Sequence, residues 1–337
     1  MSELYSWHQF HWNTIMSVLA ARRMPHALLL AGPAGMGKCI FASKLIQALT
    51  CEQPQNDGQG CNFCSGCYLQ QVGSHPDHIK ISPQEGRQGI SVDHIRQIHH
   101  QLTLSAKKSR FKTAIIYPAE IMTLSAANSL LKVLEEPPGD SVIILITNIC
   151  SQLPATIRSR CQQLWFIPPP LEEAKIWLQQ HVPSTQNLDL ISLLRLVGGA
   201  PLRALKYIDQ SLLSFREQLI NDLFFLSKEK ITFLDIAQNW LKEDLEEPLY
   251  WVLTFAEDMI RIKNKVSTQW LINPDIAHLL QFFSEKIQID ILFSFLKRIE
   301  HDLWLWKSQS SVNSQLLLEK LLIDWFLYFN EDYCEYP

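Results

Sequence analysis

The chain has little charge, little glycine and no long apolar run. Charged residues make up 19% of its 337 positions, glycine contributes 12 residues, and the formal net charge is −4. A protein that binds DNA tightly by itself usually presents a basic face, so we expect any role on nucleic acid to be shared with partners. The start of the chain lacks the basic and apolar segments of a secretory signal, and its apolar runs are too short to span a membrane. We therefore expect a cytoplasmic protein.

Four cysteines lie close together in the first part of the chain. Cys51, Cys61, Cys64 and Cys67 follow the spacing C-x9-C-x2-C-x2-C, and the polar segment 53–60 allows the chain to fold back between them. In a reducing compartment such a group does not indicate disulfides, whereas four thiolates at this spacing are typical of a tetrahedral Zn²⁺ site. The alternative is four unrelated structural thiols. Because all four predicted ligands are cysteines, we expect the zinc to be structural rather than catalytic.

Residues 32–39 read Gly-Pro-Ala-Gly-Met-Gly-Lys-Cys, a phosphate-binding loop without the last residue of its motif. In such a loop, backbone N–H groups surround the phosphates, the lysine reaches the β- and γ-phosphates, and a Ser or Thr hydroxyl holds Mg²⁺. The motif positions that remain are Gly32, Gly35, Gly37 and Lys38. Cys39 stands where the hydroxyl belongs, and a thiol is a poor ligand for a hard cation. The loop predicts nucleotide-binding ancestry and leaves open whether the chain still binds ATP; the alternative is a glycine-rich turn without a ligand.

Hydrolysis of ATP also requires acidic residues at the end of a second strand. The strand expected before position 117 leads into Tyr117 and Pro118, where those acids belong, and Glu120 lies two residues further on. A misplacement of about 1 Å can cost roughly 100-fold in rate. We therefore expect that the chain does not hydrolyse ATP by itself.

Short apolar runs alternate with helical patterns through the first half of the chain. The expected strands are 26–31, 78–82, 113–117, 142–147 and 161–167, and the expected helices are 38–49, 92–104 and 124–135. This alternation predicts a parallel α/β sheet with helices on both faces.

After Pro168-Pro169-Pro170 almost every pattern is helical. The expected helices are 171–182, 187–197, 201–226, 245–264 and an interrupted run over 276–328. We predict three parts: a P-loop domain over 1–166 that includes the four-cysteine insertion 51–67, a small helical lid over 167–208, and an all-α domain over 209–337.

One arginine stands directly before the last expected strand, in the segment Pro154-Ala-Thr-Ile-Arg-Ser-Arg160-Cys161. A short helix that ends in arginine can present the guanidinium to a neighbouring subunit. An arginine finger of that kind stabilises the charge on a transferring phosphate and is worth roughly 10³–10⁵ in rate. The alternative is a surface arginine paired with a carboxylate, and the local sequence alone favours it.

Several ordered motifs resemble one family. The run Leu130 to Pro138 (LLKVLEEPP), Ser159-Arg160-Cys161, the four-cysteine insertion and the lead-in Met24-Pro-His-Ala27 are similar to the bacterial clamp loaders, the AAA+ subunits of the DNA polymerase III holoenzyme. The resemblance covers about residues 20–166 and beyond them rests on length and helical character. It implies an AAA+ fold, a helical lid and a C-terminal collar domain.

Two branches of this family compete. The motor branch (gamma/tau) keeps the P-loop hydroxyl, the acidic pair and a nucleotide-sensing arginine in the lid. This chain has Cys39, Tyr117-Pro118 and Leu202 at those positions, with Arg203 one step away. The pattern resembles the delta prime branch, in which these features have decayed while Ser-Arg-Cys is kept.

The resemblance implies a non-hydrolysing clamp-loader subunit whose Arg160 enters the ATP site of an adjacent motor subunit. The implied partners are the motor and delta subunits in a hetero-pentamer, with the sliding clamp and primed DNA reached through the complex. Alone the chain would not be an enzyme, but it would be part of a DNA-directed DNA polymerase, a nucleotidyltransferase. The alternatives are an active motor-type AAA+ ATPase and a zinc-dependent nucleic-acid-binding module.

Overall fold

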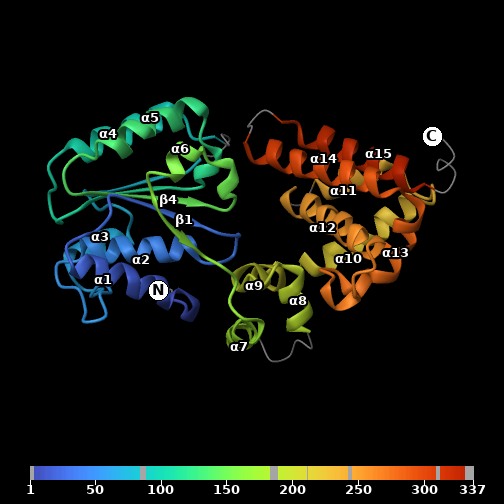
Figure 1. Ribbon diagram of the computed structural model, residues 1–337, viewed down its shortest axis with the longest axis horizontal. Coiled ribbons are helices and arrows are strands. Elements are labelled where there is room, and N and C mark those ends of the chain that lie inside the picture. The colour runs from blue at the N-terminus through green and yellow to red at the C-terminus, as the bar shows by residue number, and fades with distance from the viewer. Residues whose placement is uncertain are drawn as a thin grey trace. The chain divides into compact units, whose positions relative to one another are not determined.

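The computed structural model describes residues 4–83, 89–182, 189–210, 212–241, 245–308 and 312–330. The chain forms two compact units, Met1–Pro169 and Pro170–Pro337. Within the described ranges, the first unit contains a sheet covered by helices and the second contains helices alone (Figure 1). None of the helices in these ranges has the length and apolar character that crossing a bilayer requires.

The sheet of the first unit is entirely parallel. Its strands are β1 (Ala27–Ala31), β2 (His78–Ile81), β3 (Lys112–Ile116), β4 (Ser141–Thr147) and β5 (Gln162–Trp165). Their order is β2-β3-β4-β1-β5, so that β1 lies between β4 and β5. Every residue of β4 is buried, as expected for a central parallel strand that is covered on both faces. The predicted parallel α/β sheet is confirmed.

Helices cover both faces of this sheet (Figure 1). They are α1 (Gln9–Ala20), α2 (Lys38–Thr50), α3 (Ser65–Gln71), α4 (Val92–Thr103), α5 (Leu124–Glu135) and α6 (Ala155–Arg158), with 3₁₀ turns at Ser6–His8, Ala119–Ile121 and Cys150–Gln152. Ala27, Leu29 and Ala31 of β1 share one hydrophobic core with α4 and α5. Because side chains alternate along a strand, Leu28 and Leu30 face the opposite layer, which contains α1 and α2.

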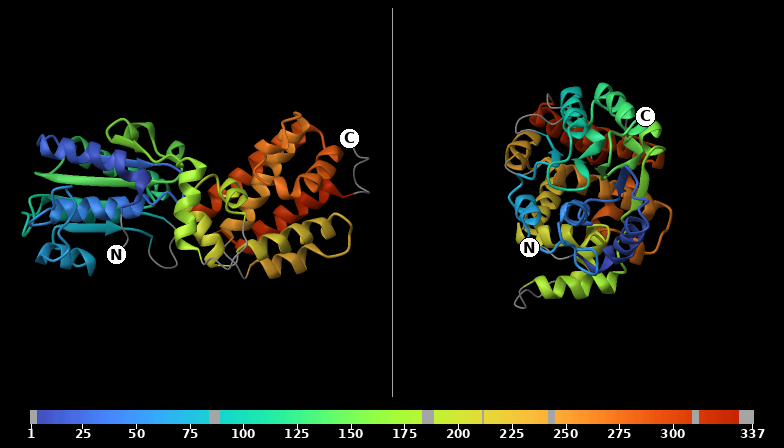
Figure 2. Two further views of the ribbon diagram at one scale, coloured as in Figure 1. Left: turned by 90° about the horizontal axis from the view of Figure 1, so that it is seen from below. Right: turned by 90° about the vertical axis from the view of Figure 1, so that its left-hand side faces the viewer.

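The second unit is helical wherever it is described (Figure 2). Its helices are α7 (Leu171–His181), α8 (Leu190–Leu196), α9 (Pro201–Asp209), α10 (Leu212–Leu226), α11 (Phe233–Trp240), α12 (Glu246–Lys263), α13 (Ala277–Lys286), α14 (Ile289–Ser308) and α15 (Ser314–Phe329), with 3₁₀ turns at Thr268–Trp270 and Pro274–Ile276. One continuous core extends from α7 to α15. The all-α character is confirmed, whereas the division into a lid over 167–208 and a collar over 209–337 stays a prediction.

One expected helix was wrong in extent. The sequence pattern over 201–226 was expected to form one helix, but the structure has α9 ending at Asp209 and α10 beginning at Leu212. The residues between and next to these helices read Asp209-Gln210-Ser211. Asp and Ser compete for backbone hydrogen bonds and therefore favour helix ends. The apolar periodicity continues on both sides of this break and conceals it.

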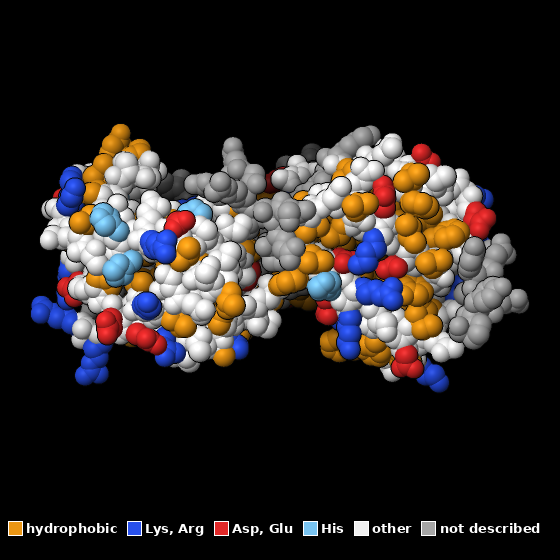
Figure 3. Space-filling view, turned by 90° about the horizontal axis from the view of Figure 1, so that it is seen from above, with side chains coloured by type: hydrophobic (Ala, Val, Ile, Leu, Met, Phe, Trp, Pro, Cys, Tyr) orange, Lys and Arg blue, Asp and Glu red, His pale blue; other side chains and the backbone are white. Residues whose placement is uncertain are grey.

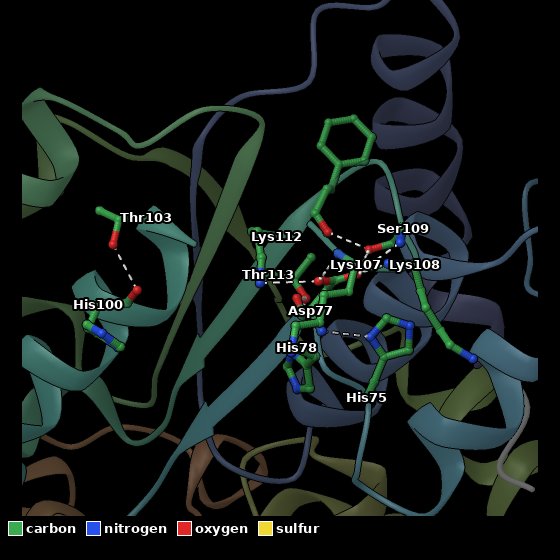
Figure 4. Close-up of polar contacts among 11 residues, drawn as sticks. His75, Asp77, His78, His100, Thr103, Lys107, Lys108, Ser109, Lys112 and Thr113 are labelled. Atoms are coloured by element: carbon green, nitrogen blue, oxygen red, sulfur yellow. Dashed lines mark hydrogen bonds and ion pairs between the residues drawn. The ribbon is translucent and has the colours of Figure 1, made fainter. Parts of the chain in front are cut away.

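A buried carboxylate fixes the edge of the sheet. Asp77 precedes β2, and its carboxylate accepts hydrogen bonds from the backbone N–H groups of Lys107, Lys108 and Ser109 (Figure 4). The Lys112 Nζ at the start of β3 lies 3.2 Å from the same carboxylate. Burial alone would raise the pKa of Asp77, but these donors hold it well below its usual value. Asp77 therefore ties the loop before β3 to the edge strand.

The histidines beside Asp77 are structural. The His75 Nδ1 accepts a hydrogen bond from the Asp77 N–H, and the His78 Nδ1 lies 3.0 Å from the Thr113 Oγ1 (Figure 4). Burial lowers the pKa of His78 to about 4. Both rings therefore form hydrogen bonds within the fold, and neither belongs to the cysteine cluster.

Charges of both signs are mixed on the face of the first unit that Figure 3 shows. Lys, Arg, Asp, Glu and His side chains lie close to one another there. This face presents no continuous basic surface of the kind that binds nucleic acid strongly.

Candidate functional site

The P-loop connects β1 to α2 and depends on its glycines. Gly35 and Gly37 both have φ of +80°, a backbone conformation that glycine adopts at little cost. A Cβ atom on Gly32 would collide with the backbone oxygen of Phe166, and one on Gly37 would meet the rings of Tyr5 and His8. The loop is therefore packed closely on both sides.

The ammonium group of Lys38 is bonded to its own protein. It donates to the carbonyl oxygens of Gly32 and Pro33, the latter at 2.6 Å, and to the Oδ1 of Asn148 at 2.9 Å. The side chain is buried, with 4% of the residue exposed. Burial lowers the pKa of Lys38 to about 8, and the nearby acidic groups of Cys39 and Glu120 oppose this shift. The amine that contacts phosphate in a P-loop is therefore bonded to carbonyl oxygens of its own loop.

Cys39 and Tyr117 stand at two positions where the motif has ligands for Mg²⁺. The Cys39 thiol and the Tyr117 side chain form a hydrogen bond, and burial raises the pKa of the thiol. Glu120 lies in the 3₁₀ turn after β3, as its distance from the strand predicted, and accepts a hydrogen bond from the Asn148 N–H at 3.0 Å. No carboxylate replaces the acidic pair at Tyr117 and Pro118. A hard cation would find few of the oxygen ligands that it prefers.

Aromatic residues from the N-terminal segment cover the loop. The Trp7 Nε1 and the His8 Nε2 both donate to the carbonyl oxygen of Met36, at 3.1 and 2.7 Å. Tyr5 stacks on Trp7, with ring centroids 4.7 Å apart. No motif in the sequence indicates that this segment reaches the P-loop.

The four cysteines come together as predicted. Their Sγ atoms lie within 4.8 Å of one another, and the pairs Cys51–Cys64 and Cys61–Cys67 are each 3.9 Å apart. A tetrahedral zinc with Zn–S bonds of about 2.3 Å requires S···S distances of roughly 3.8 Å. Backbone N–H groups of Cys61, Cys64 and Cys67 also point at sulfur atoms of the cluster, at 3.3 to 3.4 Å. Both the donor set and the spacing fit a structural zinc ion.

Arg160 follows α6 and makes contacts within this chain. Its Nη2 lies 2.7 Å from the Oε1 of Glu135, and its Nη1 donates to the Thr156 carbonyl oxygen at 3.0 Å. The arginine side chain is 38% exposed. A surface ion pair was the alternative interpretation of this residue, and the pair exists; the role in a neighbouring subunit stays a prediction.

The lid arginine has a buried partner that sequence reasoning missed. The Arg203 Nη2 donates to the Oε2 of Glu247 at 3.0 Å, and its guanidinium lies 3.7 Å from the ring centroid of Tyr250. The Tyr207 hydroxyl donates to the same carboxylate at 2.6 Å. Burial would raise the pKa of Glu247, but the Arg203 charge and these hydrogen bonds hold it below its usual value. Nothing in the local sequence links Glu247, far along the chain, to Arg203.

Comparisons with known proteins agree over most of the chain. Residues 7–170 match the family profile "DNA polymerase III, delta subunit", and residues 210–326 match "DNA polymerase III, delta subunit, C terminal". DNA polymerase III subunit delta' of Pseudomonas aeruginosa is 31% identical over 326 residues, which span 96% of this chain and 98% of the relative. The chain belongs to the delta' family. The corresponding subunit of Escherichia coli is 30% identical, with 95% of this chain and 94% of the relative covered.

This assignment confirms the resemblance to clamp-loader subunits, and it extends to the C-terminal region of the delta' chain, which contains few motifs. A solved DNA polymerase III gamma subunit-related protein from Thermotoga maritima is 19% identical, with a TM-score of 0.42, over 93% of this chain and 98% of that protein.

His8 of this delta' chain is held in one neutral form. Because the Met36 carbonyl accepts, the proton lies on Nε2, and the buried Nδ1 has no hydrogen-bond partner in the described structure. A second proton on Nδ1 would lie unpaired beside the rings of Phe41 and Phe166. Burial therefore lowers the pKa of His8 from 6.5 to about 4.

This pKa predicts a pH dependence of stability. Since unfolded His8 binds a proton near pH 6.5 and folded His8 only near pH 4, its contribution is complete above pH 6.5 and is lost as the pH falls toward 4, by at most about 3 kcal/mol. His78 acts in the same direction. His8→Gln keeps a donor for Met36, and we expect it to flatten this decline in urea unfolding measured between pH 7 and 4.5. The exposed control His99→Gln should retain the full slope; equal slopes in all three proteins would contradict the assignment.

Proposed function

We propose that this chain is a non-hydrolysing clamp-loader subunit that completes the ATP site of a neighbouring motor subunit with Arg160. Its partners would be motor (gamma/tau) and delta subunits in a hetero-pentamer, and it would reach the sliding clamp and primed DNA through that complex. The observation that carries the proposal is the bonding of Lys38 to Gly32, Pro33 and Asn148.

A closed P-loop follows from these contacts. To meet a phosphate, the Lys38 ammonium must leave three acceptors, and the freed carbonyl oxygens would then need other donors. Mg²⁺ would gain neither a hydroxyl at Cys39 nor an acid at Tyr117 or Pro118. Each change opposes binding of Mg·ATP, and together they support a loop that no longer binds it.

The same sheet supports a role for Arg160 in a neighbour. The P-loop follows the carboxyl end of β1, whereas Arg160 precedes the amino end of the adjacent parallel strand β5, where Gln162 pairs with Leu28. Four residues of strand, roughly 13 Å at about 3.3 Å per residue, separate these levels of the sheet. Arg160 therefore lies at the opposite edge of the sheet from its own P-loop, a placement that suits a head-to-tail arrangement of subunits.

The purified chain should not bind or hydrolyse Mg·ATP. We expect equilibrium dialysis at millimolar nucleotide to give no binding for the wild type, and Cys39→Thr alone not to restore it, because Lys38 keeps its internal partners. Hydrolysis that disappears in Lys38→Ala would instead support the alternative of an active motor-type ATPase.

Arg160→Ala should impair the assembled loader. In a complex reconstituted with motor and delta subunits, we expect DNA-stimulated ATPase to fall and clamp loading to fall by at least about 10-fold, since a trans arginine contributes roughly 10³–10⁵ at its site. Assembly, measured by size exclusion, should not change. Arg158→Ala, at the end of α6 and two residues before Arg160, is the control. Full loading by the Arg160 variant would reject the finger.

We also propose that the four cysteines hold one structural zinc ion. Such a site contributes folding energy because the ligands must be ordered together. The segment 51–72 contains neither lysine nor arginine, so it offers no cation to phosphate groups. This composition disfavours the alternative of a zinc-dependent nucleic-acid-binding module.

Metal analysis should find about one zinc per chain, as four thiolate ligands imply. Removal of the metal with a chelator should lower the thermal unfolding midpoint, because the cluster loses the bonds that order it. Cys61→Ser should lose most of the zinc, whereas Cys39→Ser, outside the cluster, should retain it. Equal zinc content in the two variants, or none in the wild type, would refute the site.

A further inference from the structure

Arg160 is held at the end of a neighbouring helix. Glu135 is the last residue of α5, and its Oε1 lies 2.7 Å from the Arg160 Nη2. The Thr156 carbonyl oxygen accepts from Nη1 at 3.0 Å. Two nitrogen atoms of the guanidinium are thus bonded within the subunit, and the group has a defined resting position.

The position of Glu135 explains why it attracts an arginine. Two consecutive carboxylates, Glu135 and Glu136, lie at the C-terminal end of α5, where the helix dipole disfavours negative charge. Arg160 neutralises the first of them. Glu136 is exposed and forms no ion pair within the described part of the chain. The two acids therefore lie at the same helix end, but only Glu135 is paired with an arginine.

The ion pair between Arg160 and Glu135 can be replaced by a pair between Arg160 and a phosphate. The Arg160 and Glu135 side chains are 38% and 51% exposed, so water and counterions screen their attraction. A phosphate oxygen carries more charge than a carboxylate oxygen and accepts the same planar donors. Transfer of the guanidinium from Glu135 to a phosphate group therefore replaces one charged partner by another and leaves no buried charge unpaired.

We propose that Glu135 is a positioning residue that parks Arg160 and competes with the phosphate of the neighbouring subunit's nucleotide for its guanidinium. The inference rests on the trans role of Arg160 proposed above. An exposed ion pair contributes little free energy. We therefore expect Glu135 to weaken the binding of Arg160 to the phosphate by about 1.5- to 5-fold. Removing the carboxylate should release the arginine and favour the engaged state by that factor.

The test uses the loader reconstituted with its motor and delta subunits. We expect Glu135→Gln to raise DNA-stimulated ATPase at limiting nucleotide about 1.5- to 5-fold. The matched control Glu136→Gln should leave it unchanged, and Glu135→Asp, which keeps the charge, should return the rate toward the wild-type value. In the Arg160→Ala background, Glu135→Gln should have no effect, because the group that it parks is absent.

Two results would overturn the parking role. A lower rate in Glu135→Gln would mean that the carboxylate preorganises the arginine for its task. An effect of Glu135→Gln that persists in the Arg160→Ala background would mean that the carboxylate acts through the fold of α5. Failure of the trans role is a separate result, since Arg160→Ala would then leave ATPase and clamp loading unchanged.

Discussion

The first unit depends on one lysine whose charge is used internally. The Lys38 ammonium draws the carbonyl oxygens of Gly32 and Pro33 toward the inside of the P-loop and joins the loop to Asn148, after β4. From the outside, Trp7 and His8 bond to the Met36 carbonyl. The loop is therefore held from both sides, in a conformation that positive-φ glycines permit. These contacts connect the P-loop to the N-terminal segment and to the end of β4.

The parallel sheet places the P-loop and Arg160 at opposite edges. The P-loop lies at the carboxyl edge, where parallel sheets bind ligands, and Arg160 lies at the amino edge of the next strand. Rigid pairing between β1 and β5 keeps the two groups at fixed levels. The trans role proposed for Arg160 depends on this separation, because an arginine beside its own P-loop could not reach a neighbouring subunit's nucleotide.

Sequence patterns predicted the elements that depend on residues a few positions apart. The apolar run before the P-loop, the all-buried β4 and the cysteine spacing each contain their explanation within a few residues, and the structure has the elements and the cluster that they predict. Contacts between distant segments were beyond reach: Lys38 with Asn148 across 110 positions, Arg160 with Glu135, and Arg203 with Glu247. The break between α9 and α10 was missed because the apolar face of one helix leads directly into the next. Periodicity reports which face is buried, and it does not report which partner covers it.

The internal partners also account for a buried Lys38 in a loop that has Cys39 in place of the motif's hydroxyl residue. A buried charge without a partner costs several kcal/mol, so a chain that stops binding phosphate must either replace the lysine or supply acceptors. This chain supplies them through Gly32, Pro33 and Asn148. Once Gly32, Pro33 and Asn148 accept from Lys38, replacing the lysine removes the donor that all three share. The internal contacts satisfy the lysine without a phosphate, so its presence in the motif is not by itself evidence for bound ATP.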